Sequence, residues 1–236
     1  IKVHYKELDE KSKKSYVDDL KEFIQTHKID NLNFFEIEDK SFEREFKKLE
    51  SPKLKLIEHR SPMFLFSREE FNTFHTGKKV FRMASFYKFG RKKFNIFIDK
   101  NSNPIGEKWS FDEDNRKKLS HKIDVPKLRL FKQTEHTKNL KPIIQKFFSS
   151  HPGNLESFNH PTTRKEAIKF FLDFLNVKIK LFGDYEDSIS KKSHSVFHSL
   201  LSPVINLGLL TPNTIIKETI CFAKKHKIPL NSLEGY

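Results

Sequence analysis

The stretch LNFFEIEDKSFEREFKKLESPKLKLI at residues 32–57 contains the pattern from which the fold class follows. Its two ends, LNFFEI at 32–37 and LKLI at 54–57, are short apolar runs with the composition of strands. Between them Phe42, Phe46 and Leu49 recur at helical spacing. Strand, helix and strand in this order predict a β-α-β unit with two parallel strands.

The residues before this unit extend the same pattern. KVHYKEL at 2–8 alternates with period two, and residues 15–27 place Val17, Leu20 and Ile24 on one helical face. Two consecutive β-α-β units are therefore expected, which predict an α/β fold with a parallel, doubly wound sheet. No GxGxxG or GxxxxGK[ST] motif occurs, so a dinucleotide or nucleoside-triphosphate site of the usual kind is not supported.

The middle of the chain changes character. Ser67 and Glu70 form a capping-box signature for a helix through His75, and a longer helix is expected at 79–97. Residues 99–161 hold 5 of the 10 prolines. This composition predicts a long connector with only short regular elements.

Helices are expected to dominate the last third. Thr163 and Glu166 form a second capping-box signature, and apolar residues at helical spacing predict further helices at 197–207 and 215–225. The chain starts with Ile1 inside a predicted strand and stops at Tyr236 just after a predicted helix start. We therefore expect a fragment of a longer protein that lacks both ends.

Charge is unevenly distributed along the 236 residues. The 45 Lys and Arg against 31 Asp and Glu give a formal net charge of +14. Residues 61–146 hold 20 basic and 9 acidic residues, whereas residues 1–60 hold 14 of each. A genome-wide bias toward lysine would not concentrate the excess in this way, so a polyanion partner is favoured over an ordinary solvated basic face.

The single cysteine, Cys221, excludes an internal disulfide and a multi-cysteine metal or cluster site within this sequence. It lies among apolar residues at a helical position, which predicts a buried, inert thiol. A reducing compartment, the cytoplasm, is the simplest location. No apolar stretch reaches the ~20 residues that span a bilayer, and no secretory signal is recognisable, so no membrane partner is expected.

Four strings resemble segments of one known family. They are GEKWSFDEDNR at 106–116, FGDYED at 182–187, FHSLLSPVINLGLLTP at 197–212 and LNSLEGY at 230–236. In this order and separation they resemble the deoxyribodipyrimidine photolyase-related proteins, that is, the bacterial iron–sulfur (6-4) photolyases and cryptochromes. Lys88 after Phe86-Tyr87 departs from the arginine usual in the family, which keeps the charge but loses the planar geometry.

The resemblance implies a light-driven DNA repair enzyme with non-covalent FAD, a lumazine-type antenna chromophore and a four-cysteine [4Fe–4S] cluster. It implies a partial Rossmann-like parallel-sheet antenna domain at 1–98, a connector at 99–160 and the first helices of an all-helical flavin domain at 161–236. UV-damaged DNA is the implied partner, and a monomer is expected. The implied cluster ligands lie outside this sequence, and none is assigned to Cys221.

The resemblance also assigns a cofactor site. Its FAD-binding residues in this chain are Tyr185, His198, Ser199, Leu201 and Ser202. Small hydroxyls and backbone N–H groups at the first turn of a helix are suited to a pyrophosphate, and Pro203 is tolerated there. The alternative is that Ser199 and Ser202 only cap or turn a helix.

Other residues have structural alternatives. Trp109 and Phe111 are interpreted as apolar anchors of the connector, with Asp112 and Asn115 in turn and cap hydrogen bonds, rather than as a redox relay or a carboxylate pair. No catalytic residue is assigned. The candidate phosphate contacts, each of which could equally be solvated surface, are Arg91, Lys92, Lys93, Arg116, Lys117 and Lys118.

His194 and His198 stand at i and i+4, which is a metal-ligand spacing on a helix. No HExxH motif and no nearby cysteine accompanies them, so metal binding is not favoured. For the function, two alternatives stay open. One is a cryptochrome-like blue-light photoreceptor without repair activity, and the other is a non-enzymatic basic module that binds nucleic acid.

Overall fold

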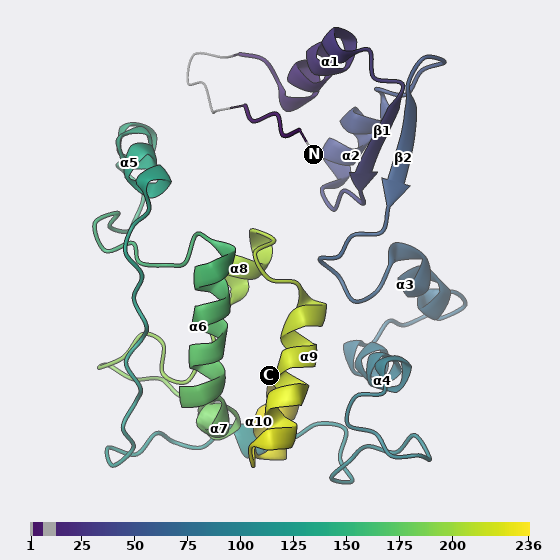
Figure 1. Cartoon of the computed structure of the whole chain (residues 1–236). Coiled ribbons are helices and arrows are strands. Elements are labelled where there is room, and N and C mark those ends of the chain that lie inside the picture. Colours follow the sequence, from purple (N-terminus) through teal and green to yellow (C-terminus); the bar gives the residue numbers. More distant parts are fainter. Residues whose placement is uncertain (1, 7–12) are drawn as a thin grey trace. The chain divides into compact units, whose positions relative to one another are not determined.

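The computed structural model describes residues 2–6 and 13–236, and it divides into two compact units, residues 1–61 and 62–236. Figure 1 shows the helices and strands, coloured by their position along the chain. The first unit contains α1 (Tyr16–His27), β1 (Asn31–Phe35), α2 (Lys40–Lys47) and β2 (Lys55–His59). The second contains α3 (Arg68–His75), α4 (Met83–Phe94), η1 (Asp112–Asn115), α5 (Glu135–Phe148), α6 (Arg164–Val177), α7 (Ile179–Phe182), η2 (Gly183–Tyr185), α8 (Ser202–Asn206), α9 (Pro212–Lys225) and α10 (Leu230–Gly235).

The first unit is a β-α-β unit preceded by α1. β1 and β2 are parallel, with Asn31 opposite Lys55 and Phe35 opposite His59. The buried side chains of the helices and of the strand ends form one apolar core, which contains Ile24, Phe46, Leu49 and Leu54. The predicted α/β class with a parallel sheet is confirmed.

The sheet is smaller than predicted. Residues 2–6 form no strand, and the remaining residues of the expected strand at 2–8 lie outside the described part. The side chains of 2–6 contact α1 instead: the His4 ring packs on Phe23 and His27, and Lys6 pairs with Asp19. Residues 31, 33 and 35 of β1 are exposed, so within this unit only one face of the sheet is covered.

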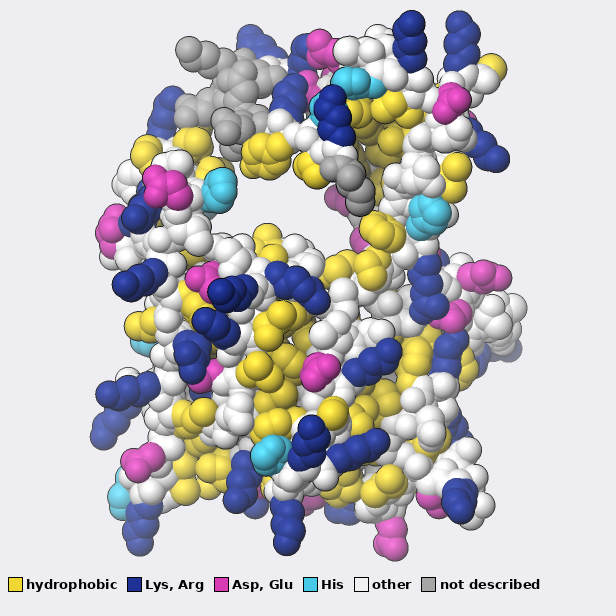
Figure 2. Space-filling view, in the orientation of Figure 1, with side chains coloured by type: hydrophobic (Ala, Val, Ile, Leu, Met, Phe, Trp, Pro, Cys, Tyr) yellow, Lys and Arg dark blue, Asp and Glu magenta, His cyan; other side chains and the backbone are white. Residues whose placement is uncertain are grey.

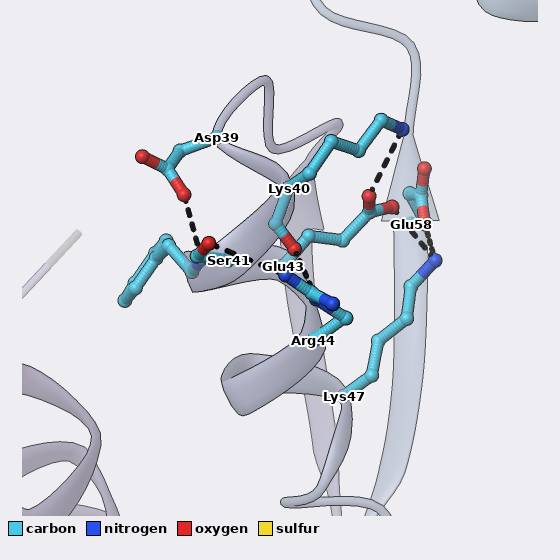
Figure 3. A network of polar contacts seen from close by, with 8 residues as sticks. Asp39, Lys40, Ser41, Glu43, Arg44, Lys47 and Glu58 are labelled. Carbon is cyan, nitrogen blue, oxygen red and sulfur yellow. Dashed lines mark hydrogen bonds and ion pairs between the residues drawn. The ribbon is translucent and has the colours of Figure 1, made fainter.

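A polar network joins α2 to β2 (Figure 3). The Glu43 carboxylate is buried and accepts from Lys40 Nζ at 3.2 Å and Lys47 Nζ at 2.9 Å. Lys47 also lies 3.4 Å from a Glu58 carboxylate oxygen on β2. Asp39 caps α2 by accepting from Phe42 N at 2.7 Å. The ion pairs and the helix cap therefore stabilise α2 and its packing against β2.

In the second unit, α6 to α10 enclose a core whose buried members include Phe170, Phe174, Ile179, Val204 and Leu210. α3 and α4 share a separate aromatic cluster formed by Phe66, Phe71, Phe74, Phe81, Phe86, Phe89 and Phe94. α3 begins as predicted, because Ser67 Oγ accepts from Glu70 N and the Glu70 carboxylate accepts from Ser67 N.

The predicted helices differ from the observed ones in three places. α5 is a 14-residue helix that contains Pro142, so the expectation of only short elements in the connector is wrong. α4 begins four residues after the predicted start at Lys79, and it ends at Phe94, where Asn95 in the left-handed region caps the helix. The helix expected at 197–207 is reduced to α8, because Val196 and Leu200 have positive φ.

Cys221 is exposed on α9, which corrects its predicted burial: its position on the helix lies outside the core that contains Ile215 and Thr219. In the part of the chain that the structure describes, no helix has the length and apolar character needed to span a membrane.

Candidate functional site

A cavity of about 440 Å³ lies between α7, α8, α9 and the loop that precedes α8. Four of the five predicted cofactor residues line it, namely His198, Ser199, Leu201 and Ser202. Its other walls are Phe182, Leu200, Ile205, Pro212, Ile215, Ile216 and Tyr236. The fifth predicted residue, Tyr185, does not line the cavity; its ring stacks on Phe197 with centroids 5.5 Å apart.

The loop at 193–201 owes its shape to buried anchors. Val196, Phe197 and Leu201 are all at least 96% buried, and Ser193 Oγ accepts from the N–H groups of Ser195 and Val196. Val196 and Leu200 have φ values of 38° and 56°. A residue other than glycine in this left-handed region raises the free energy of the folded state by about 1–3 kcal/mol. It persists only where the surrounding structure holds it. The strain is therefore supported by the apolar packing of the loop.

The backbone N–H groups of the same loop are the notable donors at the cavity. The backbone N–H groups of residues 199–202 donate to no acceptor in the described part of the chain. Consecutive N–H groups around a left-handed residue form concavities that bind anions. With the hydroxyls of Ser199 and Ser202 and the His198 ring, this wall is suited to a phosphate or a polyol.

Tyr236, the last residue of the string at 230–236, is a wall residue to which the sequence analysis assigned no role. Its ring packs against Phe174 and Phe182 with centroid distances of 4.7 and 5.6 Å. Burial raises the pKa of the Tyr236 hydroxyl, and its hydrogen bond with Ser199 opposes this shift. Only the packing of the end of α10 against α6 and α7 brings Tyr236 to the cavity, so the string by itself does not show this position.

Three of the four resemblance strings meet beside this cavity. Gly183 N donates to Ser232 Oγ at 2.9 Å, which joins FGDYED to α10. Phe111 N donates to Glu234 Oε2 at 2.7 Å, which joins the 106–116 string to the same helix. Asn115 is buried and donates to a Glu186 carboxylate oxygen at 3.1 Å. The strings therefore form one contact cluster, although more than 100 residues separate Phe111 from Glu234.

Trp109 and Phe111 of the connector contact other segments of the second unit. Trp109 is half-buried, and the cationic groups of Lys88, Arg91 and Lys92 lie 5.2 to 5.6 Å from its ring centroid. Asp112 pairs with Arg116 one turn later. The predicted anchoring role is consistent with these contacts.

Arg91 differs from its prediction as a phosphate contact. It is 4% exposed, and its guanidinium donates to the carbonyl oxygens of Ile96, Phe97 and Trp109. In this arrangement the group is used within the protein and is not available to a phosphate. Its role is to hold the turn that follows α4.

The other five basic candidates are exposed and differ in their partners. Lys93 pairs with Glu70, Arg116 with Asp112, and Lys117 with Asp184 at 2.9 Å. Lys92 lies over Trp109, and Lys118 makes no ion pair with another described residue. Within each unit, Lys and Arg side chains are dispersed over the face seen in Figure 2 rather than gathered in one stripe.

The two histidines do not share a helical face, because residues 194–198 are not helical. His198 lines the cavity, and His194 does not. Within residues 2–6 and 13–236, no group of three or more His, Cys, Asp or Glu side chains is arranged to hold a metal ion.

Comparison with known proteins now adds to this geometry. The family described as Deoxyribodipyrimidine photo-lyase-related protein matches residues 1–160. The chain belongs to this family. A "(6-4) photolyase" of Agrobacterium fabrum is 30% identical over 173 residues, which cover 73% of this chain and 34% of that protein. An uncharacterized protein of Acanthamoeba polyphaga mimivirus is 35% identical over 100 residues, which cover 40% of this chain and 50% of that protein.

The family match and the cavity concern different parts of the chain. The chain spans about a third of the Agrobacterium relative and half of the viral one. The family match ends at residue 160, and the cavity residues 198–202 follow it. Membership of the photolyase-related family is therefore shown, whereas the roles of individual residues stay predictions.

Proposed function

We propose that the protein acts as a light-driven DNA photolyase for pyrimidine (6-4) photoproducts and that it holds FAD along the cavity lined by His198, Ser199, Leu201 and Ser202. The observation that carries the proposal is that these four residues line one cavity and that the four backbone N–H groups of 199–202 have no acceptor among the described residues. Family membership supports the activity class.

The chemistry of the donors fits FAD. The N–H groups of 199–202 and the two serine hydroxyls suit the pyrophosphate, since negative oxygens accept from several donors at once. His198 and the apolar walls from Ile215, Ile216 and Tyr236 suit the polyol and ring parts of such a ligand. When bound, FAD in its reduced form supplies the electron that reverses the lesion.

The residues of this chain would bind and orient the cofactor and restrict water around it. The Tyr236 ring and the side chains of Ile215 and Ile216 give the cavity a largely apolar wall. Tyr185 is proposed as an indirect member of the site, because it stacks on Phe197, next to His198. We assign no catalytic residue and no antenna site to this chain. The four-cysteine cluster is not fitted by these residues, since the sequence contains one cysteine.

UV-damaged DNA is the proposed partner. Extruding a damaged, poorly stacked base costs only a few kcal/mol, and contacts from basic residues to phosphates offset that cost. Lys92, Lys93, Arg116, Lys117 and Lys118 remain the proposed phosphate contacts, because all five are exposed. A monomer in the cytoplasm is the proposed state.

The proposal is tested on the full-length protein, purified in the dark. We expect flavin absorption bands and a light-dependent loss of (6-4) lesions from an oligonucleotide. Ser199→Ala combined with Ser202→Ala should lower the FAD occupancy, and Ser188→Ala, whose hydroxyl bonds to the Lys117 carbonyl oxygen, serves as the matched control. Unchanged occupancy in the double variant would remove the site assignment.

The same assay separates the alternatives. Flavin without repair would indicate a photoreceptor, and DNA binding without any flavin would indicate a nucleic-acid-binding module. Only flavin together with repair supports the photolyase proposal.

A further inference from the structure

Lys178 is a buried lysine directly behind the cavity wall. It lies between α6 and α7 and is 4% exposed, in a chain whose lysines are mostly on the surface. Its Nζ donates to Ser195 Oγ at 3.1 Å and to the His198 carbonyl oxygen at 3.4 Å. Both acceptors belong to the loop at 193–201, so the side chain connects the helical core to this loop.

The ammonium group has no carboxylate partner among the residues that the structure describes. The charge that acts on it from α6 is that of Asp173, which pairs with Arg129 at 2.8 Å. Burial lowers the pKa of Lys178, and Asp173 raises it to a smaller extent. Burying an unpaired cation is costly, so such a group persists where it stabilises something else.

The loop that Lys178 contacts is strained. Ser195 and His198 are the two acceptors, and the left-handed residues Val196 and Leu200 lie between and after them. The N–H groups that have no acceptor within the described part of the chain begin at Ser199, the residue after the His198 carbonyl. A contact to that carbonyl therefore sets the direction of the peptide unit whose N–H belongs to Ser199.

We propose that Lys178 is a positioning residue for an anionic ligand: its ammonium group holds the loop at 193–201 so that the N–H groups of 199–202 face the cavity, and its positive charge is balanced by the phosphates of the ligand. This inference rests on the proposed FAD site. The inference adds Lys178 to that site as a cation that does not contact the cofactor. Lys178 acts by positioning the loop and by the electrostatic potential of its charge behind the cavity wall.

The inference predicts selectivity for phosphate. FAD and riboflavin carry the same isoalloxazine ring and ribityl chain, but only FAD carries a pyrophosphate. Removing the charge of Lys178 should therefore weaken FAD binding and leave riboflavin binding nearly unchanged. A purely structural role would weaken both ligands equally, so the ratio of the two affinities is the informative quantity.

The experiment measures both dissociation constants by flavin fluorescence on the full-length protein freed of flavin. Lys178→Met should raise the dissociation constant for FAD by about tenfold or more, which corresponds to ~1.4 kcal/mol, and change that for riboflavin by less than about twofold. Lys178→Arg keeps the charge and should retain most of the preference. Lys180→Met removes an exposed lysine two residues away and is the matched control.

A second measurement needs no variant. Because burial lowers the pKa of Lys178, the FAD-to-riboflavin preference of the wild-type protein should fall with rising pH before ordinary lysines lose their protons. Among the described residues, the charged group that acts on Lys178 is Asp173 from α6, and the loop contacts Lys178 through the Ser195 hydroxyl and the His198 backbone carbonyl oxygen.

The outcomes are distinguishable. If the wild-type protein binds neither flavin, the proposed function and this inference both fail. If it binds FAD but Lys178→Met keeps the wild-type preference, the flavin site stands and the role of Lys178 is overturned. If Lys178→Met does not fold, a preference that stays constant with pH in the wild type overturns the role in the same way.

Discussion

The Tyr87 hydroxyl donates to Glu234 Oε1 at 2.8 Å, and the other oxygen of that carboxylate accepts from Phe111 N at 2.7 Å. One carboxylate thus joins α4, the connector and α10. Desolvation raises the pKa of Tyr87, and the hydrogen bond to Glu234 raises it further. Glu234 therefore connects three separate segments of the second unit by hydrogen bonds.

Tyr87→Phe removes one hydrogen bond and should lower the free energy of unfolding by about 1 kcal/mol. Glu234→Ala should cost more, roughly 2–3 kcal/mol, because it also leaves the Phe111 N–H without an acceptor. A double-mutant cycle in urea should give a coupling of about 0.5–1.5 kcal/mol between the two residues. Tyr16→Phe, which removes an exposed hydroxyl in the first unit, is the control. Additive effects would mean that the two groups do not interact in solution.

Arg91 is expected to affect stability rather than DNA binding. Arg91→Ala removes the donor to the carbonyl oxygens of Ile96 and Trp109 and one of the two donors to that of Phe97, so it should lower the unfolding free energy by about 2–4 kcal/mol. Arg91→Lys should restore little, since an ammonium group cannot match the planar guanidinium at three acceptors. The exposed neighbour Lys92, changed to Ala, should stay within ~0.5 kcal/mol of wild type. Equal effects of Arg91→Ala and Lys92→Ala would contradict the burial of Arg91.

Gly183 is required by close approach rather than by its backbone angles. A Cβ at this position would lie 2.5 Å from Ser232 N and 2.7 Å from the Asn231 carbonyl carbon. Gly183→Ala should therefore destabilise the protein by about 1–3 kcal/mol, measured by thermal unfolding, because backbone must shift. At Gly90 the nearest atoms belong to the Phe66 side chain, at 3.2 and 3.3 Å. Gly90→Ala is the matched comparison and should cost less, because that ring can move and alanine favours the helix by ~1 kcal/mol.

The proposed DNA interface can be examined through salt dependence. Lys118 is exposed and makes no ion pair with another described residue, so its charge is free for a phosphate. If it neutralises one phosphate, Lys118→Ala should reduce the slope of log affinity against log salt by about 0.9. Lys53→Ala, an exposed lysine of the first unit, provides the comparison with equal charge loss. An identical slope in both variants would mean that Lys118 does not contact the phosphate backbone.

Lys178 should also give stability a characteristic pH dependence. Its folded-state pKa is lowered by burial, so between that value and the ordinary pKa of 10.5 the unfolded chain binds a proton that the folded chain does not. The free energy of unfolding should therefore rise with pH in this window. Tyr87 and Tyr236, whose pKa values are raised by burial, act in the opposite direction above pH ~10. The informative quantity is the difference between wild type and Lys178→Met, and a difference that does not change with pH would show that Lys178 keeps its proton throughout.

Local patterns predicted the elements that are stabilised by neighbours in sequence. The helix-spaced apolar residues Phe42 and Phe46 form α2, and the Ser67–Glu70 capping box starts α3. These predictions depend on contacts within one or two turns, which the sequence displays directly. The prediction of a strand at 2–8 was wrong for its described residues, where His4 packs on α1 instead. Alternation of apolar and polar residues does not reveal whether a neighbouring strand is available for pairing.

The sequence predicted residues of the candidate site, and their roles stay predictions. The four resemblance strings could be read from the chain, and the cavity contains four of the five residues assigned from them. Two features could not be read: the positive φ values at Val196 and Leu200, and the burial of Lys178 and Arg91. Lysine and arginine are ordinarily surface residues, so no pattern distinguishes the rare buried ones.

Composition and periodicity were therefore enough to establish an α/β β-α-β unit, a basic middle segment and a helical last third. The tertiary structure alone showed that Glu234 joins Tyr87 to Phe111 and that Lys178 lies behind the cavity wall. The reason is physical: elements form from interactions over a few residues, whereas a buried charge or a shared carboxylate depends on which distant segments exclude water together.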